Sequence, residues 1–339
     1  MAAILRAVPR EALAMQREDA GLAVGNLWPR TVGIGHTGAM PMDPSPADLE
    51  SLLHLAASHG LALDPASVRT EEVGLDFRVA FGRDAEGADW VLRIPRRPDV
   101  MGRAAVEGRL LNVLAPHLDV RVPDWRITAE DLIAYPLLPG EPGLTVSADG
   151  EVEWAIDMSS LPYADSLGTL VGRLHGMDPE EAARTGIEVR SPEEVRDGWR
   201  TDLGRVAEGF TIAPALRERW EAWIGEDSYW PDHSVLTHGE LYPGHTLVVG
   251  EQISAVLDWT TAAVGDPARD LMFQRASAPA EAFEATLESY AAAGGRPWPR
   301  IGEHCAEMYS ASPLAYGLFA LETGQEEHRQ AAAAALDPR

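Results

Sequence analysis

Turn-forming residues crowd into one short stretch of this 339-residue chain and divide its sequence pattern in two. Pro136, Pro139, Gly140, Pro142 and Gly143 interrupt any regular element there. Before this stretch, short apolar runs separated by turn residues predict strands. After it, apolar residues at helical spacing predict a mainly helical region. We therefore expect a hinge between two lobes, an arrangement that suggests a nucleotide cleft.

The expected fold class is α+β, with two lobes of different size. The N-lobe, residues 46–138, should hold a small antiparallel β-sheet with one helix and bind the nucleotide. Its expected strands and helices are 68–73, 77–82, 90–94, 125–128 and 132–135, and 46–60 and 101–114. The larger C-lobe, residues 139–339, should be mainly helical, and residues 1–45 should form an N-terminal extension. The expected helices of the C-lobe are 163–175, 193–208, 214–224, 279–292 and 301–321, around a β-rich patch at 234–257.

The charge balance excludes several classes of partner. The chain has 53 Asp+Glu against 28 Lys+Arg, a net charge of -25, which argues against a nucleic-acid or anionic-membrane surface. No apolar run reaches the roughly 20 residues that span a bilayer, and Met1–Asp19 does not resemble a signal peptide. The single cysteine, Cys305, excludes an internal disulfide and fits a cytoplasmic protein. All 28 cations are arginine, so a phosphate must be bound by arginine, backbone N–H groups or a metal.

The densest cluster of reactive side chains is H-G-E-L-Y-P-G-H, residues 238–245, followed by A-V-L-D-W at 255–259. Apolar flanks place His238, Glu240 and His245 on a loop after one strand, and Asp258 at the end of another. Two strands joined by a Gly-Glu turn would bring the loop and Asp258 together. Such a set could hold Mg²⁺ beside a general base.

Other interpretations of this cluster stay open. A mononuclear metal site could use His238, His245 and Asp258, or both histidines could merely cap and pack a turn. The H-x-E of zinc deaminases is excluded, because that site also needs P-C-x-x-C and the chain has one cysteine.

These motifs resemble those of the aminoglycoside and macrolide kinases, which share the protein-kinase-like fold. The family motif is His-Gly-Asp, four residues, then Asn or His, followed by a strand that ends in Asp. The resemblance implies that Glu240 orients the acceptor hydroxyl, that His238 holds the loop, and that His245 and Asp258 bind the metal. It also implies structural roles for two residues of G-D-P-A-R-D-L (265–271), namely Asp266 and Asp270, of which Asp270 braces the catalytic loop.

Glu240 departs from the family pattern, because the motif has Asp at this position. The extra methylene displaces the carboxylate by roughly 1 Å unless the backbone compensates, and such displacements can cost about 100-fold. A slower enzyme, a shifted loop and a nucleotide- or drug-binding module without catalysis are therefore all open interpretations.

A kinase-like cleft also needs a cation on the third strand and a carboxylate on the next helix. W-V-L-R-I-P-R-R, residues 90–97, supplies Arg93, and Glu107 is its expected partner. Arginine keeps its charge when buried and binds phosphate bidentately. The alternative is an ordinary strand arginine that reaches solvent. The other expected nucleotide-binding residues are Asp76 and Phe77, in the turn over the phosphates, and Tyr135 and Leu137, in the hinge.

Within this family the sequence is most similar to the macrolide 2'-phosphotransferases. The similarity runs from about Pro46 to the C-terminus through W-V-L-R-I-P-R-R, V-P-D-W-R, A-Y-P-L-L, L-D-W and A-A-G-G-R-P-W-P-R. It implies transfer of the γ-phosphoryl of GTP, with ATP as the alternative donor, to the 2'-hydroxyl of the desosamine sugar of macrolides, with Mg²⁺. Another alcohol or an aminoglycoside is the alternative acceptor. Oligomeric state is left open, with a monomer expected.

A macrolide needs a wide apolar pocket with a few acids. The helical lobe offers candidates for such a pocket, although any one of these aromatic residues could equally be ordinary core. The candidates are Asp202, Met272, Phe273, Tyr309, Tyr316 and Phe319.

Overall fold

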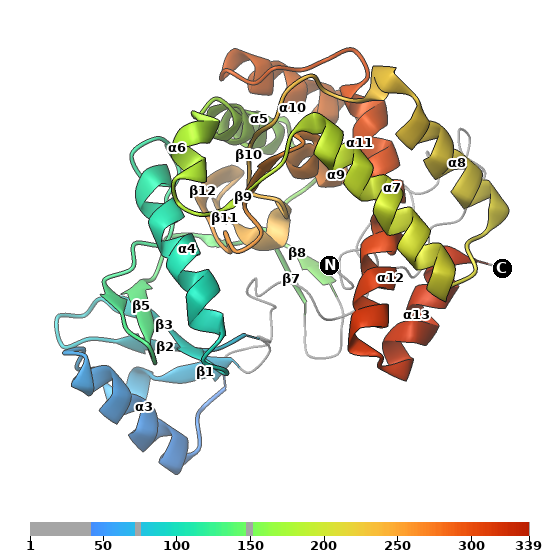
Figure 1. The fold of residues 1–339 in the computed structure, drawn as a ribbon. Coiled ribbons are helices and arrows are strands. Elements are labelled where there is room, and N and C mark those ends of the chain that lie inside the picture. Colours follow the sequence, from blue (N-terminus) through green and yellow to red (C-terminus); the bar gives the residue numbers. More distant parts are fainter. Residues whose placement is uncertain (1–41, 72–75, 147–151, 339) are drawn as a thin grey trace. The chain divides into compact units, whose positions relative to one another are not determined.

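The computed structural model describes residues 42–71, 76–146 and 152–338 (Figure 1). They form two compact units. The strand unit lies within Gly33–Ala155 and also takes in Pro243–Thr260, whereas the helical unit comprises Ile156–Tyr242 and Thr261–Arg339. The segment after the catalytic loop thus groups with the N-terminal strands, while the predicted lobe boundaries assign it to the C-lobe. Most of the predicted extension, residues 1–41, lies outside the described part.

The main sheet of the strand unit has five antiparallel strands in the order β1-β2-β3-β5-β4. Their bounds are β1 (Arg69–Glu71), β2 (Phe77–Arg83), β3 (Asp89–Pro95), β4 (Ile127–Thr128) and β5 (Ile133–Pro136). All five were predicted within a few residues. The predicted turn at 73–77 is described only from Asp76 onward.

Two helices accompany this sheet, and each packs against its own set of strand side chains. Leu92 of β3 belongs to the cluster that includes Leu52 and Ala56 of α3 (Pro46–Ser58). Val91 belongs to the cluster that includes Val100 of α4 (Val100–Leu114). Because successive side chains of a strand point to opposite faces, Arg93 shares the face of Val91 and so lies on the α4 side.

Smaller strands complete the strand unit. The predicted pair of strands joined by Gly-Glu is present as β11 (Thr246–Val249) and β12 (Gln252–Val256), and β6 (Glu141–Pro142) extends the sheet. Gly250 in the connecting turn has φ +63°, which glycine adopts without strain. A short hairpin is formed by β7 (Leu144–Val146) and β8 (Val152–Trp154), and η4 (Pro243–His245) precedes β11.

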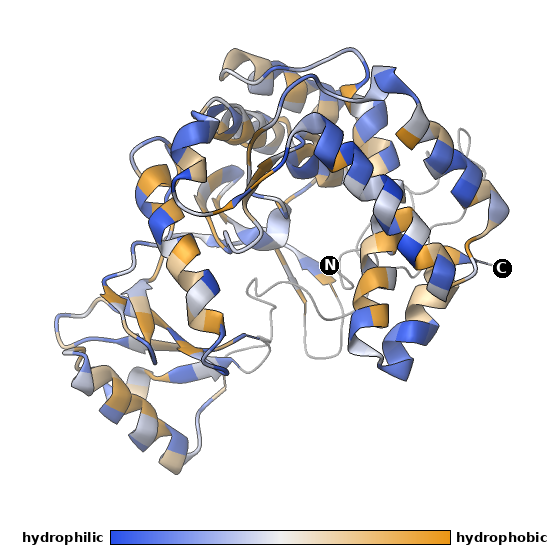
Figure 2. Cartoon of the chain, viewed as in Figure 1, coloured by the Kyte–Doolittle hydropathy of each residue, from blue (hydrophilic) through white to orange (hydrophobic). Residues whose placement is uncertain are grey.

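The helical unit surrounds a three-stranded sheet in the order β10-β13-β9 (Figure 1). The strands are β9 (Glu188–Val189), β10 (Val235–Thr237) and β13 (Ala263–Gly265). The helices are α5 (Leu161–His175), α6 (Pro179–Ala183), α7 (Pro192–Gly209), α8 (Pro214–Gly225), α9 (Ala268–Ser277), α10 (Ala280–Ala292), α11 (Ile301–Ser310), α12 (Ser312–Thr323) and α13 (Glu326–Leu336). Helix α7 is largely hydrophilic (Figure 2) and buries mainly Leu203 and Val206.

One expected helix is wrong. The sequence pattern predicts a single helix over 301–321, but the structure has two, α11 and α12, separated at Ala311. Pro313 explains the break, because it has no N–H for the preceding turn and its ring clashes with the carbonyl four residues earlier. Proline is instead accommodated in the first turn of α12.

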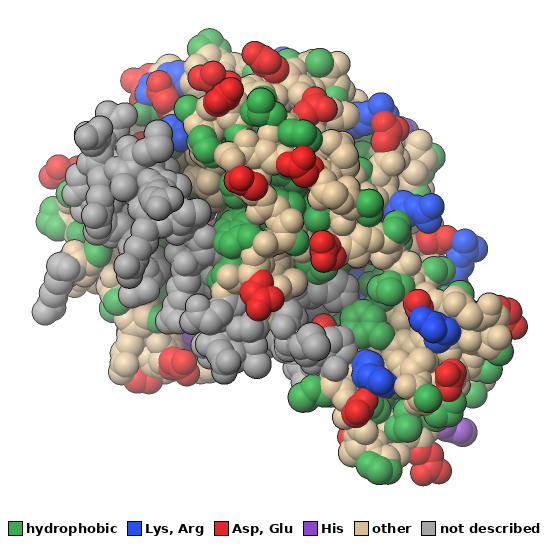
Figure 3. Space-filling model, turned by 180° about the vertical axis from the view of Figure 1, so that it is seen from behind, with side chains coloured by type: hydrophobic (Ala, Val, Ile, Leu, Met, Phe, Trp, Pro, Cys, Tyr) green, Lys and Arg blue, Asp and Glu red, His purple; other side chains and the backbone are tan. Residues whose placement is uncertain are grey.

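The surface reflects the acidic composition. On the face shown in Figure 3, acidic side chains are scattered among arginines and apolar side chains rather than gathered in one block. Among the described helices, none combines the length and the apolar character that crossing a membrane requires.

Candidate active site

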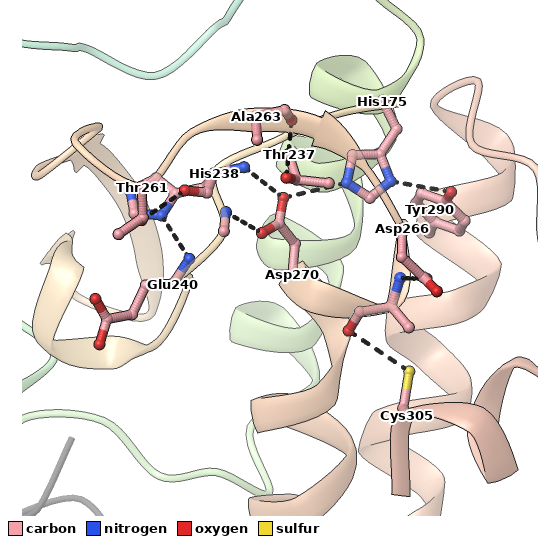
Figure 4. Close-up of polar contacts among 12 residues, drawn as sticks. His175, Thr237, His238, Glu240, Thr261, Ala263, Asp266, Asp270, Tyr290 and Cys305 are labelled. Atoms are coloured by element: carbon pink, nitrogen blue, oxygen red, sulfur yellow. Dashed lines mark hydrogen bonds and ion pairs between the residues drawn. The ribbon is translucent and has the colours of Figure 1, made fainter. Parts of the chain in front are cut away.

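The loop His238–Glu240 follows β10 in the helical unit, and one buried carboxylate hydrogen-bonds its backbone. Asp270, in the first turn of α9, accepts the N–H of His238 on Oδ2 and the N–H of Gly239 on Oδ1, each at 2.8 Å (Figure 4). Asp270 is 1% exposed. A buried carboxylate that accepts two backbone N–H groups fixes the direction in which the loop leaves the strand. This contact is the one expected of a residue that braces the loop.

Gly239 allows the chain to turn sharply at this point. Its φ is +85°, and a Cβ atom there would lie 2.3 Å from the carbonyl oxygen of Thr261. The Thr261 hydroxyl donates to the carbonyl of His238 at 3.0 Å, so the loop is tied on this side as well. Both the backbone angle and the lack of space require glycine.

Gly239→Ala should therefore displace the loop. We expect the free energy of unfolding to fall by more than about 1 kcal/mol, because φ is unfavourable and the methyl group meets backbone. Turnover should fall at the same time. Denaturant unfolding and steady-state kinetics check this, and Gly204→Ala on α7, where a Cβ meets nothing within 4 Å, is the control. Unchanged stability and turnover would contradict this account of the loop.

The two reactive side chains of the loop differ in their surroundings. His238 is fully buried, and its Nδ1 accepts the N–H of Glu240 at 3.3 Å. Glu240 is half-buried, and in Figure 4 its carboxylate points away from Asp270. Since His238 Nδ1 acts as an acceptor, its imidazole contributes to loop geometry. The role of the Glu240 carboxylate toward a substrate stays a prediction.

Burial alone would raise the pKa of Asp270, but hydrogen bonds outweigh it. The bond from His175, together with the interactions of His238, holds the pKa of the Asp270 carboxyl below its usual range. Asp270 therefore remains an anion, which is the state that accepts N–H groups. The neighbouring Asp266 accepts the N–H of Ala268 at 2.8 Å and contacts His304 Nε2 at 2.8 Å.

The strand unit contains the second cluster, centred on a buried ion pair. Arg93 Nη1 lies 3.1 Å from both carboxylate oxygens of Glu107, and the two residues are 7% and 2% exposed. The guanidinium carbon lies 4.3 Å from the centre of the Phe77 ring and 5.6 Å from that of Trp125. Burial opposes the charge, yet Glu107 and its neighbours keep the pKa of Arg93 above its usual value. The predicted pair is therefore present, on a strand and a helix as expected.

Asp258 adjoins this ion pair. It has φ +57°, which is rare for a residue other than glycine. Its Oδ2 lies 3.7 Å from His245 Nε2, and its Oδ1 accepts the Thr260 hydroxyl. The backbone of the next residue, Trp259, hydrogen-bonds the Glu107 carboxylate. Glu107 thus connects the buried cation to the turn that carries Asp258, and this strained turn is held by specific contacts.

The comparison with known proteins decides the family. The profile of the phosphotransferase enzyme family (APH) matches residues 68–304. The chain belongs to the phosphotransferase enzyme family. It is therefore a phosphotransferase, with the kinase-like fold of that family, as predicted.

The similarity extends over most of the chain. The crystal structure of the macrolide 2'-phosphotransferase MphH from Brachybacterium faecium, apoenzyme, is 68% identical, with a TM-score of 0.85 over 87% of this chain and 99% of that one. A macrolide 2'-phosphotransferase type I is 36% identical, with a TM-score of 0.81 over 88% and 99%. The uncharacterized protein YcbJ of Bacillus subtilis (strain 168) is 38% identical over 85% of this chain and 95% of its own. The resemblance predicted from the motifs is confirmed.

Membership of this family implies a divalent metal ion. The residues present fit a metal that is held partly by the protein and partly by the nucleotide. Among the described residues, no group of three or more His, Cys, Asp or Glu side chains is placed to hold a metal ion by itself. His245 and Asp258 form a pair. Magnesium is usually held by one or two carboxylates, with water and substrate phosphates as the other ligands. The pair therefore fits a metal that binds together with the nucleotide; a metal site made by His238, His245 and Asp258 alone finds no support.

The remaining predicted nucleotide residues also lie in the strand unit. Asp76 accepts from Arg97 at 2.7 Å and from Arg103 at 2.9 Å, so it holds two arginines close to the start of β2. Tyr135 is buried, and burial raises the pKa of its phenol to about 12. The side chain of Leu137 is exposed, and its N–H donates to the Asp89 carbonyl at 2.8 Å.

The predicted substrate residues fall into separate environments within the helical unit. Met272 and Phe273 are buried on α9, and the Phe273 ring lies 5.8 Å from that of Tyr242. Tyr316 and Phe319 stack on each other on α12 and pack with Ala332 of α13. The others are Tyr309, on α11 with a buried hydroxyl that has no hydrogen-bond partner among the described residues, and Asp202, on α7.

Asp202 lies in the field of several arginines. Burial raises the pKa of its carboxyl, while Arg205, Arg190 and Arg269 act in the opposite direction. Those arginines favour the charged form of this carboxylate. Its role in the substrate pocket stays a prediction, as does that of the aromatic residues.

The motifs did not identify two buried hydrogen-bond chains that end on Asp270 and on Asp266. One joins Tyr290 and His175 to Asp270, and the other joins the Trp223 indole to His304 and Asp266. Their members lie far apart in the sequence, so no local motif contains them. The G-D-P-A-R-D-L segment was the only signal, since it supplies the aspartate at the end of each chain.

Proposed function

We propose that this protein is a GTP-dependent macrolide 2'-phosphotransferase that modifies the 2'-hydroxyl of the desosamine sugar. The observation that carries the proposal is the Asp270-held His238–Glu240 loop, in a chain that matches macrolide 2'-phosphotransferases along nearly their whole length. The added phosphate brings charge and bulk to a sugar that the drug uses to bind its target, so the reaction confers resistance.

Each cluster supplies a distinct part of the reaction. Arg93, kept charged and oriented by Glu107 and the Phe77 ring, binds nucleotide phosphate oxygens. Glu240 accepts the hydrogen bond of the acceptor hydroxyl, orients its oxygen toward the γ-phosphorus and takes its proton. When bound at His245 and Asp258, magnesium supplies charge neutralisation to the phosphate oxygens. Most of the catalysis is thus positioning and electrostatics.

The hinge supports GTP as the donor. Pro136 and Pro139 have no N–H, and the N–H of Leu137 is bonded to Asp89. In an antiparallel ladder, hydrogen-bonded pairs alternate, so Tyr135 opposite Val91 is also a bonded pair. From Tyr135 to Leu137 the segment therefore offers a base carbonyl acceptors rather than N–H donors, and the N–H of Leu138 lies after this stretch. The Watson–Crick edge of guanine presents N–H donors at N1 and N2, whereas adenine needs a donor for its N1.

Pro136→Ala should weaken this selectivity. The substitution adds an N–H on the side of β5 that does not pair with β3, where adenine N1 can accept it. The ratio of kcat/KM for GTP to that for ATP is expected to fall by about 3- to 10-fold, the value of one hydrogen bond. Pro65→Ala, in η2 (Pro65–Ser67), makes the same substitution away from the hinge. A ratio that moves equally in both variants, or in neither, argues against base reading by the hinge.

A panel of acceptors tests the proposal as a whole. Release of GDP from GTP is measured with erythromycin, an aminoglycoside and a simple alcohol, in parallel with Glu240→Ala. We expect turnover with the macrolide to exceed the others, and to depend on Glu240. Turnover with the aminoglycoside alone would contradict the proposal and would indicate an aminoglycoside phosphotransferase. We further propose that the protein acts in the cytoplasm, where its free, buried Cys305 thiol remains reduced.

A further inference from the structure

A buried chain of hydrogen bonds reaches Asp270 from the opposite side to the loop. Tyr290 on α10 contacts His175 Nδ1 at 3.1 Å through its hydroxyl, and His175 Nε2 lies 3.2 Å from Asp270 Oδ2 (Figure 4). Tyr290 is fully buried, and the side chains of His175 and Asp270 are 1% and 0% exposed. The chain ends on the oxygen that accepts the N–H of His238.

With a neutral His175 imidazole, the donors and acceptors in this chain have one consistent order. The backbone N–H of Arg296 hydrogen-bonds the phenol oxygen of Tyr290, and burial raises the pKa of that phenol to about 12. The hydroxyl therefore keeps its proton and donates it to His175 Nδ1. His175 must then carry its proton on Nε2 and donate to the Asp270 carboxylate. Every link from Arg296 to the loop is satisfied, which is the condition under which a buried polar chain rigidifies its surroundings.

Close helix packing holds the members of the chain in register. A Cβ atom at Gly172 of α5 would lie 2.5 Å from the carbonyl oxygen of Tyr290, so glycine lets α5 approach α10. A Cβ atom at Gly295 would lie 2.2 Å from the Tyr290 ring. In the turn after α10, Gly295 thus packs against the Tyr290 ring, and the backbone N–H of the next residue, Arg296, hydrogen-bonds the Tyr290 hydroxyl. This turn lies within A-A-G-G-R-P-W, residues 292–298.

We propose that His175 and Tyr290 are positioning residues that hold the catalytic loop through Asp270, so that the Gly294–Arg296 turn helps to set where Glu240 lies. The inference deepens the proposed function and rests on Glu240 as the group that orients the acceptor hydroxyl. Neither residue touches a substrate. Their effect is on the fraction of molecules in which the carboxylate is in the productive position.

The neighbouring pair provides a matched control. His304 and Asp266 are as buried as His175 and Asp270, with an Nε2 to Oδ2 distance of 2.8 Å. Asp266, however, accepts from Ala268 at the start of α9, and among the described residues it makes no hydrogen bond with the loop. Loss of either histidine should lower stability, but only loss of His175 should loosen His238–Glu240.

The experiment compares Tyr290→Phe, His175→Leu, His175→Gln and His304→Gln in the full chain. Hydrogen exchange of peptides that cover residues 236–242 reports loop mobility without any need for activity. The exchange rate of this peptide is expected to rise about 3- to 10-fold in Tyr290→Phe, the factor that corresponds to the loss of one hydrogen bond, and by more in His175→Leu. His175→Gln should restore much of the protection, because its amide can donate to Asp270, and His304→Gln should leave this peptide unchanged.

Kinetics supply the second arm. Tyr290→Phe should lower kcat by a factor similar to the rise in exchange, with KM for GTP unchanged, and should cost nothing further in a Glu240→Ala background. Equal loop exchange in the Tyr290, His175 and His304 variants would overturn the proposal. The proposal would also be overturned if Tyr290→Phe lowered kcat by the same factor in the parent and in Glu240→Ala. If the parent does not phosphorylate a macrolide but the exchange pattern holds, the proposed function fails and the positioning chain stands.

Discussion

Glu240→Ala is expected to lower kcat for phosphate transfer to a macrolide by about 100- to 10,000-fold, the range for loss of a general base. KM for GTP should change little, because phosphate binding is assigned to Arg93. The folded loop should persist, since Asp270 holds it through the N–H groups of His238 and Gly239 rather than through the Glu240 side chain. Steady-state kinetics with GTP and erythromycin measure the change, and thermal unfolding confirms that the variant is folded.

Glu240→Asp and Glu240→Gln separate the role of the carboxylate from its reach. Gln keeps the length but cannot take a proton, so it should be nearly as slow as Ala. Asp shortens the side chain by one methylene, a displacement of roughly 1 Å, and is expected to be slower than the parent by up to about 100-fold. Turnover in the Asp variant with none in the parent would instead support a binding module that has lost catalysis, and would contradict the role given to Glu240.

Arg93→Ala is expected to raise KM and Kd for GTP at least about 10-fold, because one charge-assisted contact to phosphate is typically worth 1.5–3 kcal/mol. It should also lower the free energy of unfolding by about 3–5 kcal/mol, since Glu107 is then left as a buried charge without its partner. Isothermal titration with a GTP analogue and denaturant unfolding measure the two effects.

A second substitution distinguishes these effects. In the Arg93→Ala, Glu107→Gln double variant the buried charge is gone, so stability should partly recover while GTP binding stays weak. Arg93→Lys keeps a charge but loses the planar group that stacks on Phe77, and is expected to lie between the parent and Arg93→Ala. Unchanged GTP affinity in Arg93→Ala would remove Arg93 from the phosphate site.

Much of the site could be predicted because its residues lie in local patterns. Because the chain has no lysine, a cationic side chain at the phosphate site had to be arginine. The apolar neighbours of Arg93 on a strand predicted that it is buried. The pair with Glu107 then followed from the helix after that strand, and the structure contains it. The Gly-Glu turn at 250–251 likewise predicted the β11–β12 pair that precedes Asp258.

What the sequence could not provide depends on contacts across long separations. His175 and Tyr290 are 115 residues apart, and a histidine or tyrosine on a helix has no pattern that marks it as a partner of Asp270. The single helix expected over 301–321 was wrong because apolar spacing continued through Pro313 and outweighed the proline. Helix α13 was missed because its alanine-rich sequence has little amphipathic pattern.

The most direct test of the central claim is the identity of the product. Erythromycin is incubated with the protein, GTP and magnesium, and the product is analysed by phosphorus–proton correlation NMR. The account predicts a single phosphomonoester whose phosphorus couples to the proton on C2' of desosamine, formed by the parent and not by Glu240→Ala. A phosphate on any other hydroxyl, or no phosphorylated macrolide at all, would contradict it.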